Sequence, residues 1–141
     1  DKKNPNACSS KECLIGKWQF KAFIDMDSCK VEFTPDSFRV KLPGDQFSYT
    51  HYKSEDSIWF KYKSSDSIIG YSVANKFHGK GKVTEKDSVK IQLSSITKVG
   101  EPEWGSKYVD LFFKSGNHKF VIKSDSLFLY NKNHKMYFIK N

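Results

Sequence analysis

The chain has 141 residues, a length that predicts one domain, and aromatic residues make up 16% of it. No apolar run approaches the roughly 18 residues that a membrane-spanning helix needs. The net charge is +8, but Arg39 is the only arginine among 24 basic residues. Because specific base and phosphate readout favours the planar guanidinium, this composition argues against nucleic-acid binding.

The first 13 residues are polar, include a proline and show no apolar periodicity. They predict a flexible tether over 1–13, followed by a single domain over 14–141. A tether of this kind is typical of a mature bacterial lipoprotein whose lipidated cysteine precedes it. We therefore expect attachment to a membrane through an N-terminal lipid and a location in the bacterial cell envelope, in the periplasm or at the outer membrane.

Three cysteines lie in the first fifth of the chain, at Cys8, Cys13 and Cys29. A disulfide can join Cys8 to Cys13 within the tether, or join either of them to Cys29, and one thiol is left over. Three thiolates with no histidine nearby make a poor zinc site, so no metal is expected here.

Alternation of apolar and polar residues begins at residue 17 and predicts a half-buried strand with Trp18, Phe20, Ala22 and Ile24 on one face. Similar β-rich segments follow at 37–42, 47–52, 57–62, 88–93, 118–122, 126–130 and 135–139. Asp-Ser pairs recur at 27–28, 36–37, 56–57, 66–67, 87–88 and 125–126. Because both side chains can bond the local backbone, these pairs predict hairpin turns.

The segment 68–83, IIGYSVANKFHGKGKV, is rich in glycine and lysine. It lacks the spacing of a phosphate-binding loop and is not followed by a helix pattern. We interpret it as a structural turn between a strand at 68–73 and a short strand at about 80–84. Its glycines would then serve positive φ angles or close backbone approach.

One segment departs from the two-residue period. Apolar residues at Trp104, Tyr108, Leu111 and Phe112 share one face of a helix, with Pro102 in its first turn and Gly116 beyond its end. The expected fold is therefore α+β, an antiparallel meander or small barrel of about 8–10 strands with one helix near 102–115 before the last strands.

The order of these elements resembles the META domain family, which includes the bacterial HslJ-type proteins, over residues 14–24 and 57–140. The residues that carry the likeness are Gly70, Asn75, Phe77, Gly79, Gly81 and Thr97. The family's Cys-Asn pair has Ala74 in place of cysteine, and the aromatic segment at 27–56 is expanded. The resemblance implies a non-enzymatic envelope protein, with structural roles for the six motif residues.

No catalytic or cofactor-binding constellation is apparent in the sequence. The four histidines, His51, His78, His118 and His134, have no metal-ligand spacing and are expected at the surface. We therefore predict no enzyme activity and no cofactor.

Aromatic residues in the expanded region indicate a binding surface instead. They alternate faces along their strands, so some must point outward. The predicted contact residues for an envelope protein partner are Phe47, Tyr49, His51, Trp59 and Tyr62.

Two alternatives stay open. Gly16-x-Trp18 resembles the lipocalin signature, and an eight-stranded barrel could carry one small apolar ligand in an enclosed cavity, with a change in Trp18 or Trp59 fluorescence on binding. Lipocalins, however, place their helix after the eighth strand. The second alternative is an envelope-bound peptidase inhibitor that blocks its target with the N-terminal arm or a hairpin loop.

Overall fold

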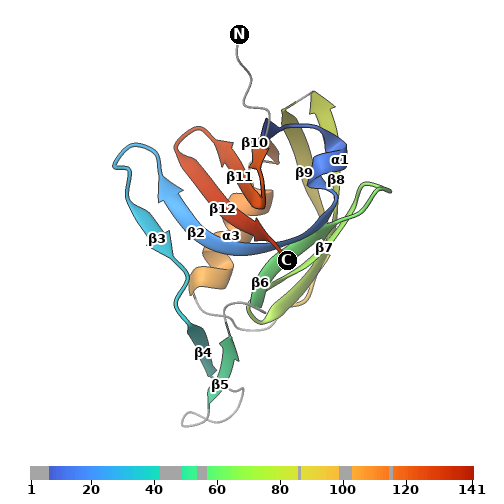
Figure 1. Cartoon of the computed structure of the whole chain (residues 1–141). Helices are drawn as coiled ribbons and strands as arrows, with labels where there is room; N and C mark the ends of the chain where they lie inside the picture. The colour runs from blue at the N-terminus through green and yellow to red at the C-terminus, as the bar shows by residue number, and fades with distance from the viewer. Residues whose placement is uncertain (1–6, 42–48, 54–56, 86, 99–102, 115) are drawn as a thin grey trace.

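The computed structural model describes residues 7–41, 49–53, 57–85, 87–98, 103–114 and 116–141. Its main body is a closed antiparallel barrel of eight strands (Figure 1). In order around the barrel these are β10 (Asn117–Lys123), β11 (Ser126–Asn131), β12 (His134–Lys140), β2 (Gly16–Asp25), β6 (Ile58–Tyr62), β7 (Ser67–Ser72), β8 (Asn75–Glu85) and β9 (Ser88–Ile96). The β9–β10 pairing closes the ring.

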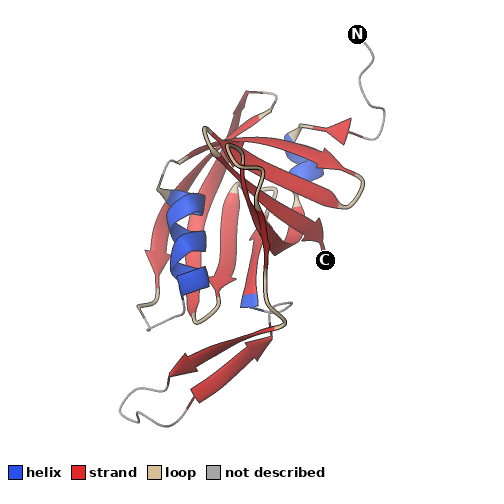
Figure 2. Ribbon diagram, turned by 90° about the vertical axis from the view of Figure 1, so that its left-hand side faces the viewer, coloured by secondary structure: helices blue, strands red, loops and turns tan. Residues whose placement is uncertain are grey.

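Four further strands and two short helices complete the described fold. Strand β1 (Ala7–Cys8) pairs with β10, and β3 (Val31–Phe33) pairs with β2. Strands β4 (Ser37–Lys41) and β5 (Tyr49–Lys53) form a separate hairpin that projects from the barrel (Figure 2). The helices are α1 (Lys11–Leu14) and α3 (Glu103–Phe113). None of the described helices has the length and apolar character needed to cross a bilayer.

The predicted antiparallel barrel and the helix before its last three strands are confirmed. The molecule is mostly β, however, so the expected α+β class fits it only loosely. Hairpin connections are found at the predicted Asp-Ser turns 27–28, 66–67, 87–88 and 125–126, while the pair at 56–57 lies partly outside the described residues. The prediction is wrong for the pair at 36–37, because it links β3 to β4 and these two strands belong to different sheets.

Aromatic rings fill the interior of the barrel. Helix α3 lies across one end, and α1 lies at the other (Figures 1 and 2). Tyr108 and Phe112 of α3 have no exposed surface, and their ring centroids lie 5.3 Å from Phe20 and 5.1 Å from Phe60 respectively. The position where the carrier alternative places its ligand is therefore occupied by the protein's own aromatic side chains, two of them from α3.

A bulge in β2 changes which residues face inward. Along β12, Tyr137 is opposite Ala22 and Phe138 is opposite Phe20, so Lys21 is an extra residue. Beyond this bulge Phe23, not Ala22, continues the inward face, and it contacts Phe20 at a centroid distance of 4.6 Å. The prediction that Ala22 and Ile24 share a face with Phe20 is wrong, because strict alternation cannot anticipate an inserted residue.

The 68–83 stretch is a hairpin, but its turn is shorter than expected. Only Val73 and Ala74 separate β7 from β8, and β8 begins at Asn75 rather than near residue 80. Gly79 therefore lies inside a strand, where a side chain would meet the backbone carbonyl of Gln92 on β9. Of the two functions expected for these glycines, the structure shows close backbone approach.

The N-terminal segment from Ala7 is folded onto the barrel, so the tether prediction does not hold for residues 7–13; residues 1–6 lie outside the described part. Cys8 and Cys13 form a disulfide, and Cys29 is free and exposed. Leu14 is 1% exposed, and its carbonyl accepts a hydrogen bond from Trp18 Nε1 at 2.8 Å. Burial of Leu14 and pairing of β1 with β10 hold this segment at the end of the barrel.

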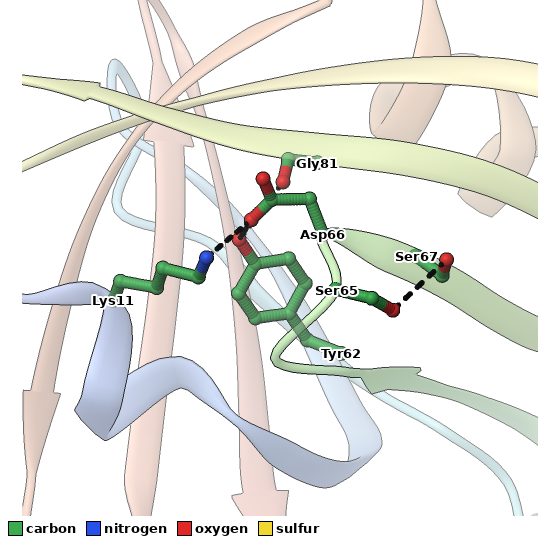
Figure 3. Close-up of polar contacts among 6 residues, drawn as sticks. All are labelled: Lys11, Tyr62, Ser65, Asp66, Ser67 and Gly81. Carbon is green, nitrogen blue, oxygen red and sulfur yellow. Dashed lines mark hydrogen bonds and ion pairs between the residues drawn. The ribbon is translucent and has the colours of Figure 1, made fainter.

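An ion pair also joins this segment to the barrel wall (Figure 3). Lys11 Nζ lies 2.8 Å from Asp66 Oδ1, and the same carboxylate accepts a hydrogen bond from the Tyr62 hydroxyl at 2.7 Å. Bonds from Lys11 and then from Tyr62 lower the pKa of Asp66. The pair is partly exposed, so its contribution to stability is small.

Candidate functional site

The exposed side of α3 forms the wall of a groove of about 620 Å³ at one end of the barrel. Its lining residues are Glu103, Ser106, Lys107, Asp110, Leu111, Lys114, Asn131 and His134. A smaller pocket of about 180 Å³ adjoins it, because Glu103 and Lys107 line both. Phe23, Glu32 and Trp104 form the rest of this pocket.

An aromatic wall distinguishes the smaller pocket. The Trp104 ring stacks on Phe23 with centroids 5.3 Å apart and planes 19° apart, and Phe38 meets Trp104 edge-on at 6.2 Å. The β2 bulge turns Phe23 toward this end of the barrel, and the first turn of α3 supplies Trp104. Phe23 is only 4% exposed, so the half-buried Trp104 ring supplies most of the apolar surface that is open to a small molecule.

Lys107 brings a charge to the same place. Its Nζ lies 4.5 Å from the centroid of the Phe23 ring and 3.4 Å from Glu32 Oε1. Both partners of the ion pair are more than a third exposed, at 40% for Lys107 and 45% for Glu32, so the pair is weak. The ammonium group can therefore exchange Glu32 for the polar part of a ligand at little cost.

The sequence predicts a different site, and among the described residues the structure does not bring His51, Trp59 and Tyr62 together. Trp59 lies on the outer wall of the barrel. The centroid of its ring lies 5.3 Å from that of Tyr71 and 4.3 Å from Lys17 Nζ. His51 is exposed on the separate β4–β5 hairpin, and Tyr49 begins β5 opposite Lys41. Phe47 lies outside the described residues.

Tyr62 does not belong to any surface. It is 1% exposed, and its hydroxyl lies within hydrogen-bond distance of Asp66 and of the Gly81 carbonyl, at 2.7 and 2.8 Å. Burial and the bond to Asp66 raise the pKa of Tyr62 well above its ordinary value of 10. Side chains alternate between the two faces of β6, so that Trp59 points outward and Tyr62 points into the barrel. Tyr62 therefore cannot contact a partner protein.

The residues of the META resemblance lie along β7 and β8 and directly after β9. Asn75 is buried, and its Oδ1 accepts a hydrogen bond from Thr97 Oγ1 at 3.0 Å. Thr97 Oγ1 in turn accepts one from the Lys76 amide at 2.9 Å. Phe77 is fully buried and contacts Phe112 of α3 at 5.8 Å.

One histidine expected at the surface is buried. His118 is 2% exposed, and its Nε2 lies 2.8 Å from the carbonyl of Phe112 near the end of α3. Its Nδ1 has no hydrogen-bond partner among the described residues. Sequence spacing placed His118 at a strand start among polar residues, and only the closure of β9 against β10 buries it.

Acid should destabilise the fold through this residue. Burial lowers the pKa of His118 from its ordinary 6.5, so below pH 6.5 the unfolded chain binds a proton that the folded chain resists. We expect the unfolding free energy to decrease from pH 7 to pH 5, by at most about 1.4 kcal/mol per pH unit for this group. Urea unfolding of wild type and His118→Gln across this range measures the effect.

The His118→Gln variant should show a shallower pH dependence than wild type. His78, which is exposed on β8, provides the control, since His78→Gln should leave the dependence unchanged. Equal slopes for wild type and His118→Gln would contradict the assignment.

No family model matches this chain, and no curated protein matches it. Among solved structures, a lipocalin-like protein from Bacteroides uniformis aligns with a TM-score of 0.53 and 19% identity, over 91% of this chain and 98% of that one. A protein from Burkholderia xenovorans aligns with a TM-score of 0.60 and 13% identity, over 100% of this chain and 94% of that one.

At these identities the likeness concerns the fold alone. The META resemblance therefore stays a prediction. What the comparisons and the strand order together support is a small closed antiparallel barrel of the kind seen in a bacterial lipocalin-like protein.

Proposed function

We propose that this chain is a non-enzymatic binding protein that takes a small apolar or amphipathic molecule at the α3 end of its barrel. The observation that carries the proposal is the Phe23–Trp104 stack beside Lys107, at the adjoining hollows of about 620 and 180 Å³. The lipocalin-like fold supports a ligand-binding role. Because aromatic side chains fill the interior of the barrel, we place the ligand site at the end of the barrel and not in its lumen.

The arrangement suits a molecule with one apolar and one polar part. The apolar part would cover Trp104 and Leu111, which are only partly buried. The polar part would meet the mixed charges of Lys107 and Asp110 along the helix. Ligand sites commonly combine an apolar surface with a few polar groups that set orientation.

The Cys8–Cys13 disulfide supports an oxidising, extracytoplasmic location, because such bonds persist mainly in exported proteins. Attachment through an N-terminal lipid and an envelope protein partner remain predictions.

Tryptophan fluorescence tests the ligand site, because the three tryptophans occupy three environments. Trp18 is fully buried in the barrel, Trp59 lies on the outer wall and Trp104 lines the site. We expect a saturable change in emission on titration with sodium dodecanoate below its micellar concentration. Trp104→Phe should abolish the change, and Trp59→Phe should preserve it.

Two outcomes would contradict this proposal. A change lost in Trp59→Phe but kept in Trp104→Phe would place the molecule on the outer wall. A change that survives both substitutions would arise from Trp18 and would place the molecule inside the barrel.

Lys107→Met keeps the aliphatic part of the side chain and removes the charge. It should weaken dodecanoate binding several-fold if the ammonium group contacts the carboxylate head group.

A further inference from the structure

Strand β3 leaves one edge of the sheet open at the surface. It pairs with β2 on one side, with Val31 opposite Ile24 and Phe33 opposite Ala22, and with no other described strand. Figure 1 shows it at the outside of the barrel, beside β2. Natural proteins usually shield such edges, because the free amide groups can pair with another chain.

The hydrogen-bond pattern shows which amide groups are free. The Asp25 amide donates to the Lys30 carbonyl, and the Thr34 amide donates to the Lys21 carbonyl, each at 2.9 Å. In an antiparallel ladder, pairs that exchange hydrogen bonds alternate with pairs that do not. The N–H and C=O groups of Val31 and Phe33 therefore point away from β2, toward the open edge.

The same two residues carry exposed apolar side chains. Val31 is 43% exposed and Phe33 is 66% exposed, and Phe33 has the largest exposed fraction among the exposed large apolar residues of the described chain. Phe33 also lines a groove of about 630 Å³ at the point where the chain leaves the barrel for the β4–β5 hairpin. The other lining residues are Gln19, Lys21, Thr34, Pro35, Asp36, Ser37 and Lys53.

The charges around this edge favour an acidic occupant. Lys21 and Lys53 line the groove, against one carboxylate from Asp36. Glu32 alternates with Val31 and Phe33 along β3, and its carboxylate lies 3.4 Å from Lys107 Nζ, at the pocket on the other side of the strand. Cross-strand partners share a face, so Tyr137 and Lys135 of β12, opposite Ala22 and Ile24, belong to the same outer wall as Phe33 and Val31. Lys135 therefore adds a positive charge to this wall.

We propose that β3 is a docking edge for an extended acidic segment of a partner protein. The segment adds as a strand antiparallel or parallel to Val31–Phe33, with its backbone bonded to the free amide groups of these two residues. One apolar side chain of the segment covers Phe33, and its carboxylates meet Lys21 and Lys53. Main-chain bonding with pockets for alternate side chains is a known mode of peptide recognition.

The probe is a synthetic peptide, blocked at both ends, that has one valine flanked on each side by glutamates, so that carboxylates lie on both faces of the added strand. Its control is a peptide of equal length with lysine in place of each glutamate. We expect the acidic peptide to bind and to slow hydrogen exchange at the amides of Val31 and Phe33, as followed by NMR. The basic peptide should bind at least tenfold more weakly. Protection confined to other strands, or no binding of the acidic peptide at millimolar concentration, would overturn the proposal.

Two substitutions of Phe33 distinguish the contribution of its backbone N–H group to peptide affinity from that of its side chain. Phe33→Pro removes a free N–H donor without removing a bond to β2, and proline is tolerated at strand edges in this orientation. We expect it to reduce affinity at least tenfold. Phe33→Thr keeps the donor and should reduce affinity less.

The double variant Lys21→Gln/Lys53→Gln tests the two positive charges. It should bind the acidic peptide more weakly than wild type, and its affinity should depend less on salt concentration.

Equal affinities of wild type and a folded Phe33→Pro variant for the acidic peptide would rule out strand addition. Should that variant not fold, the exchange measurement on the wild-type chain decides alone. Protection of Val31 and Phe33 that rises with protein concentration in the absence of peptide would identify a second copy as the occupant and overturn the proposal.

Discussion

Replacing Phe112 by alanine should lower the free energy of unfolding by about 3–5 kcal/mol, as is typical of a buried phenylalanine. Phe112 has no exposed surface, and its ring lies 5.1 Å from Phe60 and 5.4 Å from Tyr108 by centroid. Truncation leaves a cavity in the barrel interior, because strands closed into a ring cannot move together to fill it. The midpoint temperature of thermal unfolding should decrease by about 10–15 °C, given the entropy of unfolding expected for a chain of this length.

The neighbouring residue provides the control for this substitution. Leu111 is partly exposed on the outer side of α3, so Leu111→Ala should cost clearly less than Phe112→Ala. A dry apolar cavity binds small apolar molecules, so benzene should restore part of the stability of Phe112→Ala and leave Leu111→Ala unchanged. Equal losses in the two variants would mean that α3 does not fill the barrel.

Replacing Gly70 by alanine should destabilise the fold by about 3 kcal/mol, at the upper end of what overpacking usually costs. A Cβ at this position would meet the backbone carbonyl of Trp59 and the ring of Phe77. The first belongs to the paired strand β6 and the second is fully buried, so neither can withdraw without disturbing the barrel. Urea unfolding monitored by circular dichroism measures the loss.

Lys61 provides a nearby comparison for Gly70. It is exposed on β6, one residue beyond the partner of Gly70, and Lys61→Ala should change stability by no more than about 0.5 kcal/mol. A neutral Gly70→Ala substitution would show that close packing is not the reason for glycine at this position.

Much of the local structure could be predicted from the sequence, because it depends on near neighbours. Two-residue alternation predicts the strands that carry Trp18 and Phe120, and the spacing of Trp104, Tyr108 and Phe112 predicts the helix observed at Glu103–Phe113. Asp-Ser pairs predict several of the turns between strands.

Less of the two candidate sites could be predicted from the alternation of apolar and polar residues. Phe23 lines the α3 pocket only because Lys21 is inserted in β2, and no pattern of alternation announces a bulge. Phe33 is not among the predicted contact residues, although its alternation with Glu32 and Val31 after a turn is a signal of an edge strand. The sequence predicts Tyr62 at the surface, because alternation shows that a strand has two faces and does not say which of them is inside.

The sequence by itself determined the period of each element and the order of strands and helix, since these follow from backbone geometry and the side chains of adjacent residues. Tertiary structure alone decided the remaining features. Closure of β9 against β10 buries His118, and folding of the N-terminal segment buries Leu14. Packing of Tyr108 and Phe112 of α3 against the rings of the strands fills the lumen that a carrier would keep open. Each of these outcomes depends on contacts between residues far apart in the chain, whose geometry exists only once the barrel has closed.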